Sequence, residues 1–407
     1  MIRTNKKLYY KYFDLMRVST FLDDKDLSLR AGYVLSIIQS NNNTDLISLS
    51  PLDLQNIGFD KVTIDEIEEF RKTKEILFIH DYVNSMDKWI KFLILPDFFN
   101  LLMISRLFKE EKIGSKDQLI AYFMSKKSEE KFGKDKSELF AYFVQNMDGD
   151  TFPHKYRKEY SKYDSVTLSI SGTKILGNFH NHTPYSDGRC SIKELKDMAK
   201  SYDRTYIGIS DHTKRVKGVD EDTIIEQHHE IEELNSLDDN FVVLKSLECE
   251  ILYNGELDIS DEYLNKCDYI IAAVHSDTCM TKAEATKRVL KAVDNSYTNI
   301  LAHPSSRIYQ KNIGLFLDMH KIIDACVANN VAIEINGDAD RLDLDPRFIM
   351  YALNKGAFFT VDSDTHSIEG FRSINNAIRI AEDYHIPPER ILNTYNRERL
   401  NILFQKR

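Results

Sequence analysis

Histidines and carboxylates recur in the second half of the sequence, each close to the end of a short apolar run. The chain has 12 histidines. Six of them are placed in this way together with three carboxylates, and the nine residues are His180, His182, Asp187, His212, Glu248, His275, His303, Asp364 and His366. A single histidine after a strand is more often an ordinary polar residue than a metal ligand. Nine such groups drawn together are costly to desolvate without cations, and nitrogen and oxygen ligands suit zinc, manganese or iron.

Two pairs in this set have the spacing of ligands on one strand face. His180 and His182 are separated by one residue, and so are Asp364 and His366. Side chains alternate with period two along extended backbone, so each pair points to the same side. The sequence therefore predicts a site for several divalent ions.

The apolar runs that precede these residues have the spacing of βα repeats. Seven runs rich in Ile and Val are expected to form strands, at 175–180, 205–212, 241–248, 269–275, 299–303, 331–336 and 358–364. They recur at close to the roughly 30 residues of one βα unit. Apolar residues at helical spacing lie between them, as in 192–202 and 319–326. We expect an α/β barrel of seven parallel strands, whose active site lies at the carboxyl ends of the strands.

Residues 1–170 have a helical pattern and form a separate domain in this interpretation, with residues 171–407 as the barrel domain. Charged amphipathic segments such as 62–72 and 117–125 predict helices. Residues 1–171 hold 26 Lys and Arg against 26 Asp and Glu, which leaves 28 against 38 for residues 172–407. An acidic domain is poorly suited to bind a polyanion, unless its acids and histidines hold divalent cations.

Composition bounds the class of protein. A chain of 407 residues with 42% hydrophobic and 29% charged residues is typical of a globular protein of two or three domains. The longest apolar stretch, from Trp89 to Ile104, contains Lys91, Pro96 and Asp97, so no transmembrane helix is expected. The amino-terminal residues lack the apolar region of a secretory signal, and we expect a cytoplasmic location.

Several segments of the second half together resemble the PHP (polymerase and histidinol phosphatase) domain. They are NFHNHTPYSDG (178–188), ISDHT (209–213), SLECEILYNGELD (246–258), AAVHS (272–276), LAHPSSR (301–307), EINGDADRLDL (334–344) and DSDTH (362–366). The version at the carboxyl end of bacterial family X DNA polymerases is the most similar. The resemblance covers about 172–407 and implies a distorted seven-stranded barrel with a trinuclear metal centre.

The resemblance also implies roles for individual residues. It assigns one ion to His180, His182, Glu248 and Asp364, a second to Glu248, His275 and His303, and a third to Asp187, His212 and His366. Three divalent ions per chain, of Mn, Zn or Fe, would support phosphoester hydrolysis, with Glu248 and Asp187 among the catalytic groups. Arg307 and Arg341 are candidates to grip the phosphate. The alternative for these arginines is an ion pair with a nearby acid such as Asp338 or Asp343.

The first domain has only a weak likeness to the corresponding part of those polymerases. Segments 54–70 and 101–119 resemble helix-hairpin-helix units, in which glycines let backbone N–H groups approach DNA phosphates. Gly58 is in place, whereas the second segment has Ser-Arg-Leu-Phe where glycines are needed. Only Gly114-Ser115 and the pair Asp148/Asp150 echo a polymerase palm, and we interpret them as loop residues. A helical scaffold or dimerisation module is the favoured interpretation over a DNA-binding domain.

Three functions remain open at this point. The leading hypothesis is a metal-dependent nuclease of the 3'-5' exonuclease type that acts on single-stranded DNA ends. The first alternative is a phosphomonoesterase acting on a small metabolite, of the histidinol-phosphatase type. The second is a non-catalytic PHP scaffold in DNA repair, which the complete set of nine ligands disfavours.

Overall fold

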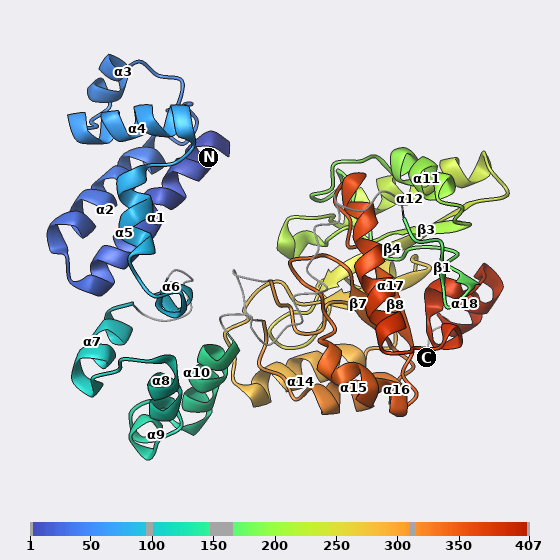
Figure 1. Cartoon of the computed structure of the whole chain (residues 1–407). Helices are drawn as coiled ribbons and strands as arrows, with labels where there is room; N and C mark the ends of the chain where they lie inside the picture. The colour runs from blue at the N-terminus through green and yellow to red at the C-terminus, as the bar shows by residue number, and fades with distance from the viewer. Residues whose placement is uncertain (1–2, 95–100, 147–165, 309–313, 405–407) are drawn as a thin grey trace. The chain divides into compact units, whose positions relative to one another are not determined.

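The computed structural model divides the chain into two compact units, residues 1–148 and 149–407 (Figure 1). The structure describes residues 3–94, 101–146, 166–308 and 314–404. Within those ranges, no helix combines the length and the apolar character that a bilayer crossing requires. The pair Asp148/Asp150 lies outside the described residues.

The first unit is helical throughout its described residues. Its helices are α1 (Arg3–Leu22), α2 (Lys25–Ser40), α3 (Pro51–Asn56), α4 (Lys61–Thr73), α5 (Leu77–Asn84), α6 (Lys88–Ile94), α7 (Leu101–Glu111), α8 (Lys116–Phe123), α9 (Lys126–Phe132) and α10 (Lys134–Asn146). The helices predicted at 62–72 and 117–125 correspond to α4 and α8. Apolar side chains of α1 to α5 form one core, in which Leu15, Ile38 and Ile67 are fully buried.

The two segments with a helix-hairpin-helix likeness each contain two helices joined by a short turn. In segment 54–70 the turn between α3 and α4 contains Gly58, whose φ of +110° favours glycine. Asp60 caps α4 by accepting a hydrogen bond from the backbone N–H of Thr63 at 2.7 Å. In segment 101–119, Gly114 lies in the loop before α8 and Ser115 caps that helix, as expected for loop residues. A role for either hairpin in DNA binding stays a prediction.

The second unit is built around a curled parallel sheet. Its strands are β3 (Tyr206–Ile209), β4 (Val242–Glu250), β5 (Tyr269–Ala273), β6 (Ile300–Leu301), β7 (Ala332–Asn336) and β8 (Phe359–Asp362), and they pair in chain order. A short antiparallel pair, β1 (Ser169–Ile170) and β2 (Thr173–Lys174), precedes them. All residues of β5 and β7 are buried, as expected of parallel strands covered on both faces. Six of the seven predicted strands are therefore present.

Helices connect and cover the strands (Figure 1). They are α11 (Ile192–Ser201), α12 (Glu221–Ser236), α13 (Asp261–Leu264), α14 (Lys282–Val293), α15 (Met319–Ala328), α16 (Pro346–Asn354), α17 (Ile374–Asp383) and α18 (Arg397–Leu403). Capping boxes begin α11 at Ser191 and α14 at Thr281, where a glutamate three residues later completes the motif. Buried apolar residues of α11 to α17 pack on the sheet in one core, whereas Leu400 of α18 belongs to a second cluster with Phe179 and Tyr269.

The predicted first strand, 175–180, is not a strand in the structure. Its backbone runs beside β3, where the Gly208 N–H donates to the carbonyl of Asn178 at 2.8 Å. On the other side a side chain replaces the ladder, because the Phe179 N–H donates to the carboxylate of Asp362 at 2.7 Å. The segment closes the ring between β3 and β8 without regular pairing.

Asn393 provides the second part of this closure from beyond β8. Its carbonyl accepts from the Leu176 N–H at 2.7 Å, and its side-chain amide donates to the carbonyls of Gly177 and Val361 at 3.2 and 3.0 Å. The side-chain oxygen of Asn393 accepts from the Val361 N–H at 2.8 Å. On the β8 side, contacts of Asn393 and Asp362 thus take the place of a regular strand ladder.

The predicted domain boundary at residue 170 differs from the division seen in the structure. Val166 and Ile170 are buried in the core of the second unit, although the sequence analysis assigned them to the first domain. The Thr167 N–H donates to the side chain of Asn375 on α17 at 2.7 Å. Residues 166–170 therefore belong with the sheet, because their apolar side chains find their burial there.

The burial of His228 on α12 is expected to make the free energy of unfolding depend on pH. The side chain is 7% exposed, and its Nε2 lies 3.9 Å from the Sγ of Cys267. Burial, with a smaller effect of Lys245, lowers the pKa of His228 from 6.5 to about 4. Below pH 6.5 the unfolded chain takes up a proton that the folded chain does not bind until about pH 4. The stabilisation is therefore complete above pH 6.5 and is lost as the pH falls towards 4.

We expect His228→Gln to remove this dependence. The wild-type free energy of unfolding should fall relative to that of the variant by about 2 kcal/mol between pH 7.5 and pH 5, since each pKa unit is worth about 1.4 kcal/mol. Urea unfolding at a series of pH values measures the difference. The neighbouring His229, whose side chain is 72% exposed, is the matched control and its Gln variant should follow the wild type. Parallel curves for His228→Gln and wild type would contradict the prediction.

Candidate metal centre

All nine predicted ligands lie at one end of the parallel sheet. His180 and His182 flank Asn181, which forms an isolated parallel bridge with Thr365. Glu248 is on β4 itself, and the other ligands follow the ends of strands or lie in the loop after His182. His303 and Asp364 have positive φ angles of 28° and 50°. Left-handed backbone at residues with a side chain is unfavourable and is concentrated at functional sites.

Glu248 is the fully buried centre of the cluster. Its Oε1 lies 2.8 Å from the Nε2 of His303 and 3.2 Å from the Nε2 of His275. Its Oε2 lies 2.8 Å from the Nδ1 of His212, 3.3 Å from the Nε2 of His180 and 3.5 Å from the Nε2 of His182. The two oxygens of one carboxylate therefore face two different sets of imidazoles.

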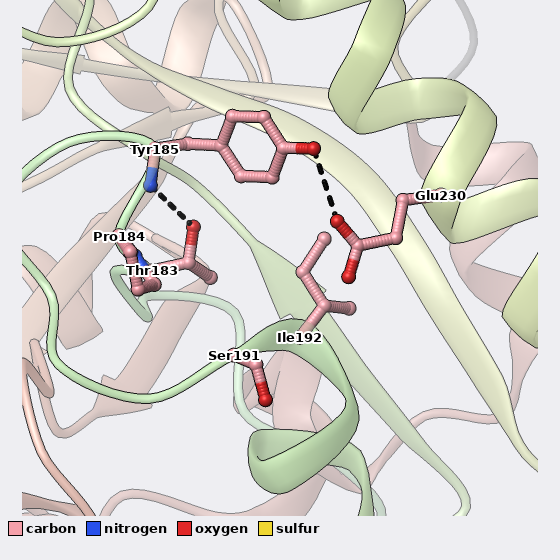
Figure 2. Close-up of a pocket in the computed structure, with 6 residues that line it drawn as sticks. All are labelled: Thr183, Pro184, Tyr185, Ser191, Ile192 and Glu230. Atoms are coloured by element: carbon pink, nitrogen blue, oxygen red, sulfur yellow. Dashed lines mark hydrogen bonds between the residues drawn. The ribbon is translucent and has the colours of Figure 1, made fainter.

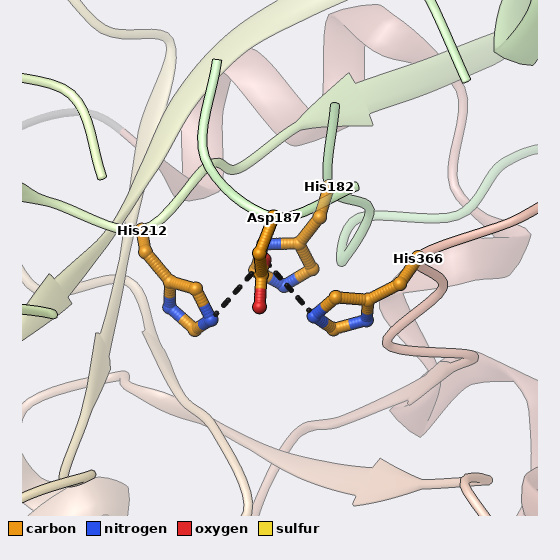
Figure 3. A group of neighbouring side chains, drawn as sticks. All are labelled: His182, Asp187, His212 and His366. Carbon is orange, nitrogen blue, oxygen red and sulfur yellow. Dashed lines mark ion pairs between the residues drawn. The ribbon is translucent and has the colours of Figure 1, made fainter. Parts of the chain in front are cut away.

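Asp187 gathers three imidazoles at the outer edge of the cluster (Figure 3). Its Oδ1 lies 3.2 Å from the Nε2 of His366, 3.7 Å from the Nε2 of His212 and 3.8 Å from the Nδ1 of His182. The side chain of Asp187 is 57% exposed, in contrast to the buried Glu248. Asp187 and His366 are the most exposed of the nine predicted ligands.

Asp364 joins the inner imidazoles to an arginine. Its Oδ1 lies 3.2 Å from the Nε2 of His182 and 3.5 Å from the Nε2 of His180. Its Oδ2 lies 3.0 Å from the Nε of Arg341 and accepts a hydrogen bond from the side chain of Asn336 at 3.1 Å. Arg341 therefore lies directly at the cluster, in an ion pair with one of the predicted ligands, and its contact with a phosphate stays a prediction.

The nine residues form four overlapping groups of potential ligand atoms. They are His182, Asp187, His212 and His366; His180, His182 and Glu248; His180, His303 and Asp364; and His212, Glu248 and His275. The first contains the whole predicted third set. The other groups divide the inner residues differently from the resemblance, since Asp364 is grouped with His303. The assignment of residues to individual ions stays a prediction.

The donor set fits divalent metal ions. Buried side-chain atoms of the cluster that have no hydrogen-bond partner are Nε2 of His180, both ring nitrogens of His182, Nδ1 of His212, Nε2 of His275, Nδ1 of His303 and Oε2 of Glu248. Buried polar atoms are nearly always satisfied, so a concentration of unsatisfied ring nitrogens requires an explanation. Imidazole nitrogen and carboxylate oxygen are the ligands that zinc, manganese and iron prefer.

The pKa shifts in the cluster divide the imidazoles into two groups. Burial and the neighbouring imidazoles lower the pKa of His182 to about 3, and burial and Arg341 lower that of His303 to about 3. Burial would raise the pKa of Glu248, but the surrounding imidazoles, His275 foremost, hold it well below its usual range. Against the effect of burial, Glu248 and Glu250 raise the pKa of His275 to about 9, and Asp187 and Asp364 raise that of His366 to about 9. Because an imidazole binds metal in its neutral form, metal binding would displace protons from these two rings.

Two buried glutamates that the sequence analysis did not select hold histidines in place. The Oε1 of Glu334 on β7 lies 2.6 Å from the Nδ1 of His180, and its Oε2 accepts from the backbone N–H of His303 at 2.7 Å. The Oε2 of Glu250 lies 2.8 Å from the Nδ1 of His275. A carboxylate on one ring nitrogen fixes the imidazole so that the other faces the ligand position. Each glutamate lies in a largely buried strand, Glu250 in β4 and Glu334 in β7. A carboxylate within or just after an apolar run is the sequence signal by which these residues could have been found.

Asp211, also not selected from the sequence, supports the loop between His182 and Asp187. Its carboxylate accepts from the backbone N–H of Thr183 at 2.7 Å, from the Thr183 hydroxyl at 2.5 Å and from the side chain of Gln227 at 2.7 Å. It also accepts from the hydroxyl of Ser186. The carboxylate thus fixes the loop that carries Asp187 to the outer imidazoles.

Arg307 does not face the cluster. Its guanidinium donates to the backbone carbonyls of Arg341 and Leu342 and lies 3.4 Å from a carboxylate oxygen of Asp345. Of the two alternatives predicted from the sequence, a phosphate contact or an ion pair with a nearby acid such as Asp338 or Asp343, the structure shows an ion pair, and its partner is Asp345.

The loop after His182 also forms one wall of a cavity of about 250 Å³ (Figure 2). The hydroxyl of Tyr185 donates across it to the carboxylate of Glu230 on α12 at 3.0 Å. The lining residues are Thr183, Pro184, Tyr185, Ser191, Ile192 and Glu230. The loop between His182 and Asp187 therefore borders the histidine cluster and also lines this mostly apolar cavity.

The fold and the cluster define an α/β domain that carries a metal-binding group at the carboxyl ends of its parallel strands. Over 233 residues, or 56% of this chain and 41% of the relative, the sequence is 31% identical to the DNA polymerase/3'-5' exonuclease PolX of Bacillus subtilis. Over 231 residues, or 54% of this chain and 92% of the relative, it is 24% identical to a probable phosphatase of Acetivibrio thermocellus. The chain thus spans less than half the length of the Bacillus protein.

One solved structure similar to this chain is that of histidinol phosphate phosphatase from Lactococcus lactis, complexed with zinc, L-histidinol and phosphate. The TM-score is 0.40 at 14% identity, over 51% of this chain and 93% of that one. No family model matches the chain. Its similarity to PolX and to the probable phosphatases, together with the motifs at the strand ends, supports a relationship to the PHP family.

Proposed function

We propose that this protein is a metal-dependent hydrolase of phosphate esters. The observation that carries the proposal is the position of Glu248, whose two oxygens face separate sets of imidazoles with unsatisfied nitrogens. A carboxylate placed in this way is suited to bridge two cations. The nine residues would hold about three ions, of manganese, zinc or iron, as the motifs imply.

The roles of the residues follow from their positions. Bound divalent ions supply Lewis acidity, which lowers the pKa of water and neutralises phosphate charge. Within the described chain, the Nε of Arg341 pairs with Asp364 and no hydrogen bond engages its two terminal nitrogens. These nitrogens can donate to two oxygens of a phosphate. Asp187, half-exposed at the edge, is the carboxylate through which a proton can pass between the site and solvent.

Within this class we propose action on single-stranded DNA ends as a 3'-5' exonuclease. The support is the similarity to the Bacillus protein, which is named as an exonuclease. A second candidate, hydrolysis of a small phosphomonoester, is supported by the probable phosphatase of which this chain covers 92%. The balance of 26 basic and 26 acidic residues in 1–171 offers little electrostatic attraction for DNA.

The decisive experiment compares substrates with one enzyme preparation. The manganese-loaded protein is assayed on labelled single-stranded DNA and on a panel of phosphomonoesters, at salt concentrations from 50 to about 200 mM. We expect measurable cleavage of DNA, with a KM that rises only modestly with salt because few phosphates are neutralised by basic side chains.

Two other outcomes separate the candidates. Efficient hydrolysis of a phosphomonoester with no cut in any DNA or RNA would replace the nuclease with the phosphatase. Inactivity on both substrate classes, with metal bound, would contradict the proposed function as a whole and favour a non-catalytic scaffold.

A further inference from the structure

Two loops meet beside the cluster and hold each other through side chains. The first, residues 303–307, follows β6, and the second, residues 341–345, follows β7. The backbone N–H and the hydroxyl of Ser305 donate to the Oδ2 of Asp343 at 2.8 and 2.7 Å. Asp343 is fully buried, so this contact is shielded from solvent. The position of the second loop therefore depends on the first.

Arg307 makes the most extensive contact between these loops. Its Nη2 donates to the carbonyl of Arg341 at 3.0 Å and to that of Leu342 at 2.7 Å, and its Nε donates to the Arg341 carbonyl at 3.2 Å. Its Nη1 lies 3.4 Å from the Oδ2 of Asp345, and the side chain is 17% exposed. The guanidinium of Arg307 thus donates its hydrogen bonds to backbone carbonyls of the 341–345 loop, which contains Arg341.

The backbone that Arg307 holds has an unfavourable conformation. Leu342 has a φ of +46°, in the left-handed region that residues with a Cβ rarely adopt. Such a conformation persists only where surrounding contacts enforce it. The hydrogen bond from Arg307 to the Leu342 carbonyl is one of those contacts. It fixes the turn immediately after Arg341, and hence the direction in which the Arg341 side chain leaves the backbone.

The contacts of the Arg341 side chain require a fixed backbone position. It is 13% exposed and its Nε pairs with the Oδ2 of Asp364, on the carboxylate whose other oxygen faces His182. A guanidinium that must satisfy a buried carboxylate and also present its terminal nitrogens has little freedom of position. A shift of the backbone at Arg341 would break one of these contacts.

We propose that Arg307 is a positioning residue, which aims the guanidinium of Arg341 at a phosphate oxyanion by holding the carbonyls of Arg341 and Leu342. This inference rests on the proposed function for the identity of the ligand. It assigns unequal tasks to two arginines that the sequence presents as equivalent. Arg341 contacts the phosphate, and Arg307 acts only through Arg341.

A double-mutant cycle tests this dependence. The full-length, metal-loaded protein is titrated with inorganic phosphate by calorimetry, in the wild type, Arg307→Met, Arg341→Met and the double variant. Methionine retains part of the apolar stem and removes the donors. Each single variant should bind phosphate about tenfold more weakly, whereas Arg307→Met should have less than about a twofold effect when Arg341 is already absent. Metal content should be equal in all four proteins.

Controls separate positioning from general destabilisation. Arg347 pairs with the same carboxylate of Asp345, at 2.8 Å, and Arg347→Met should bind phosphate as the wild type does. Arg307→Lys, which keeps the charge but cannot serve both carbonyls with a planar fork, should lose part of the affinity and keep the dependence on Arg341. It also serves as the test variant if Arg307→Met does not fold.

An equal effect of the Arg307 variants with and without Arg341 would overturn the proposal, because Arg307 would then act independently. Normal phosphate binding by Arg341→Met would overturn it as well. Failure of the proposed function looks different: the wild type would hydrolyse no phosphate ester, while the phosphate-binding cycle would still report on Arg307.

Discussion

Glu248→Gln is expected to lower phosphoester hydrolysis by more than about 100-fold and to reduce the bound metal at the same time. The carboxylate is fully buried and contacts imidazoles through both oxygens. Glutamine preserves the shape but replaces one oxygen by an amide that can only donate, and it removes the negative charge. An amide donor directed at a ring nitrogen blocks the position of a cation. Because two ions would share this carboxylate, both should be weakened by the single change.

Elemental analysis and steady-state kinetics on the same preparation measure this effect. Glu256→Gln is the matched control. Glu256 follows the same strand, its side chain is 60% exposed, and it pairs with Lys291. It should retain both metal and activity. If Glu248→Gln kept near-normal activity while His275→Ala did not, the bridging role of Glu248 would be wrong.

Removal of the metal is expected to abolish activity and to destabilise the fold. The purified, undialysed protein should contain about three divalent ions per chain. Ligands that bind only the folded state stabilise it by about 4 kcal/mol at a concentration about 1,000 times the Kd. Chelation should therefore lower the unfolding midpoint, because the buried carboxylate of Glu248 is left without its cations. Hydrolysis should fall to background because no Lewis acid is left to lower the pKa of water and to neutralise the phosphate charge.

Re-addition of different ions provides the control. Manganese or zinc should restore both the unfolding midpoint and hydrolysis. Calcium should restore neither, since it requires six to eight oxygen ligands and most ligands here are imidazoles. Fewer than two ions per chain, with no gain in stability on adding manganese or zinc, would contradict the metal centre.

The ligand positions could be predicted from the sequence because they depend on a local pattern. Each apolar run predicts a strand, and parallel strands in a ring bring their carboxyl ends to one edge. His275 and His303 each lie two residues beyond a strand end, where this reasoning expected them. Residue type and strand order were sufficient to bring these two side chains to one edge, and their role as metal ligands stays a prediction.

The supporting residues could not be predicted in the same way, because their partners are distant in sequence. Glu334 contacts His180, which is 154 positions away in the sequence. The carboxylate of Asp362 accepts a hydrogen bond from the backbone N–H of Phe179, 183 positions away. The orientation of Arg307 depends on the turn after His303, where Ser306 has a φ of +57°. A local pattern places such a residue near the site but does not determine which way it points.

The irregular closure of the sheet has a consequence for how the protein matures during synthesis. The segment that carries His180 and His182 is joined to β8 partly through Asn393, which is fully buried between them. The contacts that Asn393 contributes to this closure can form only after residue 393 has left the ribosome, and all nine predicted ligands precede it in the sequence. The strands from β3 to β8 can form in order as they appear, whereas the two sides of the metal centre meet only at the end. We therefore expect the predicted ligands of the two sides to come together late in synthesis, after residue 393 has emerged.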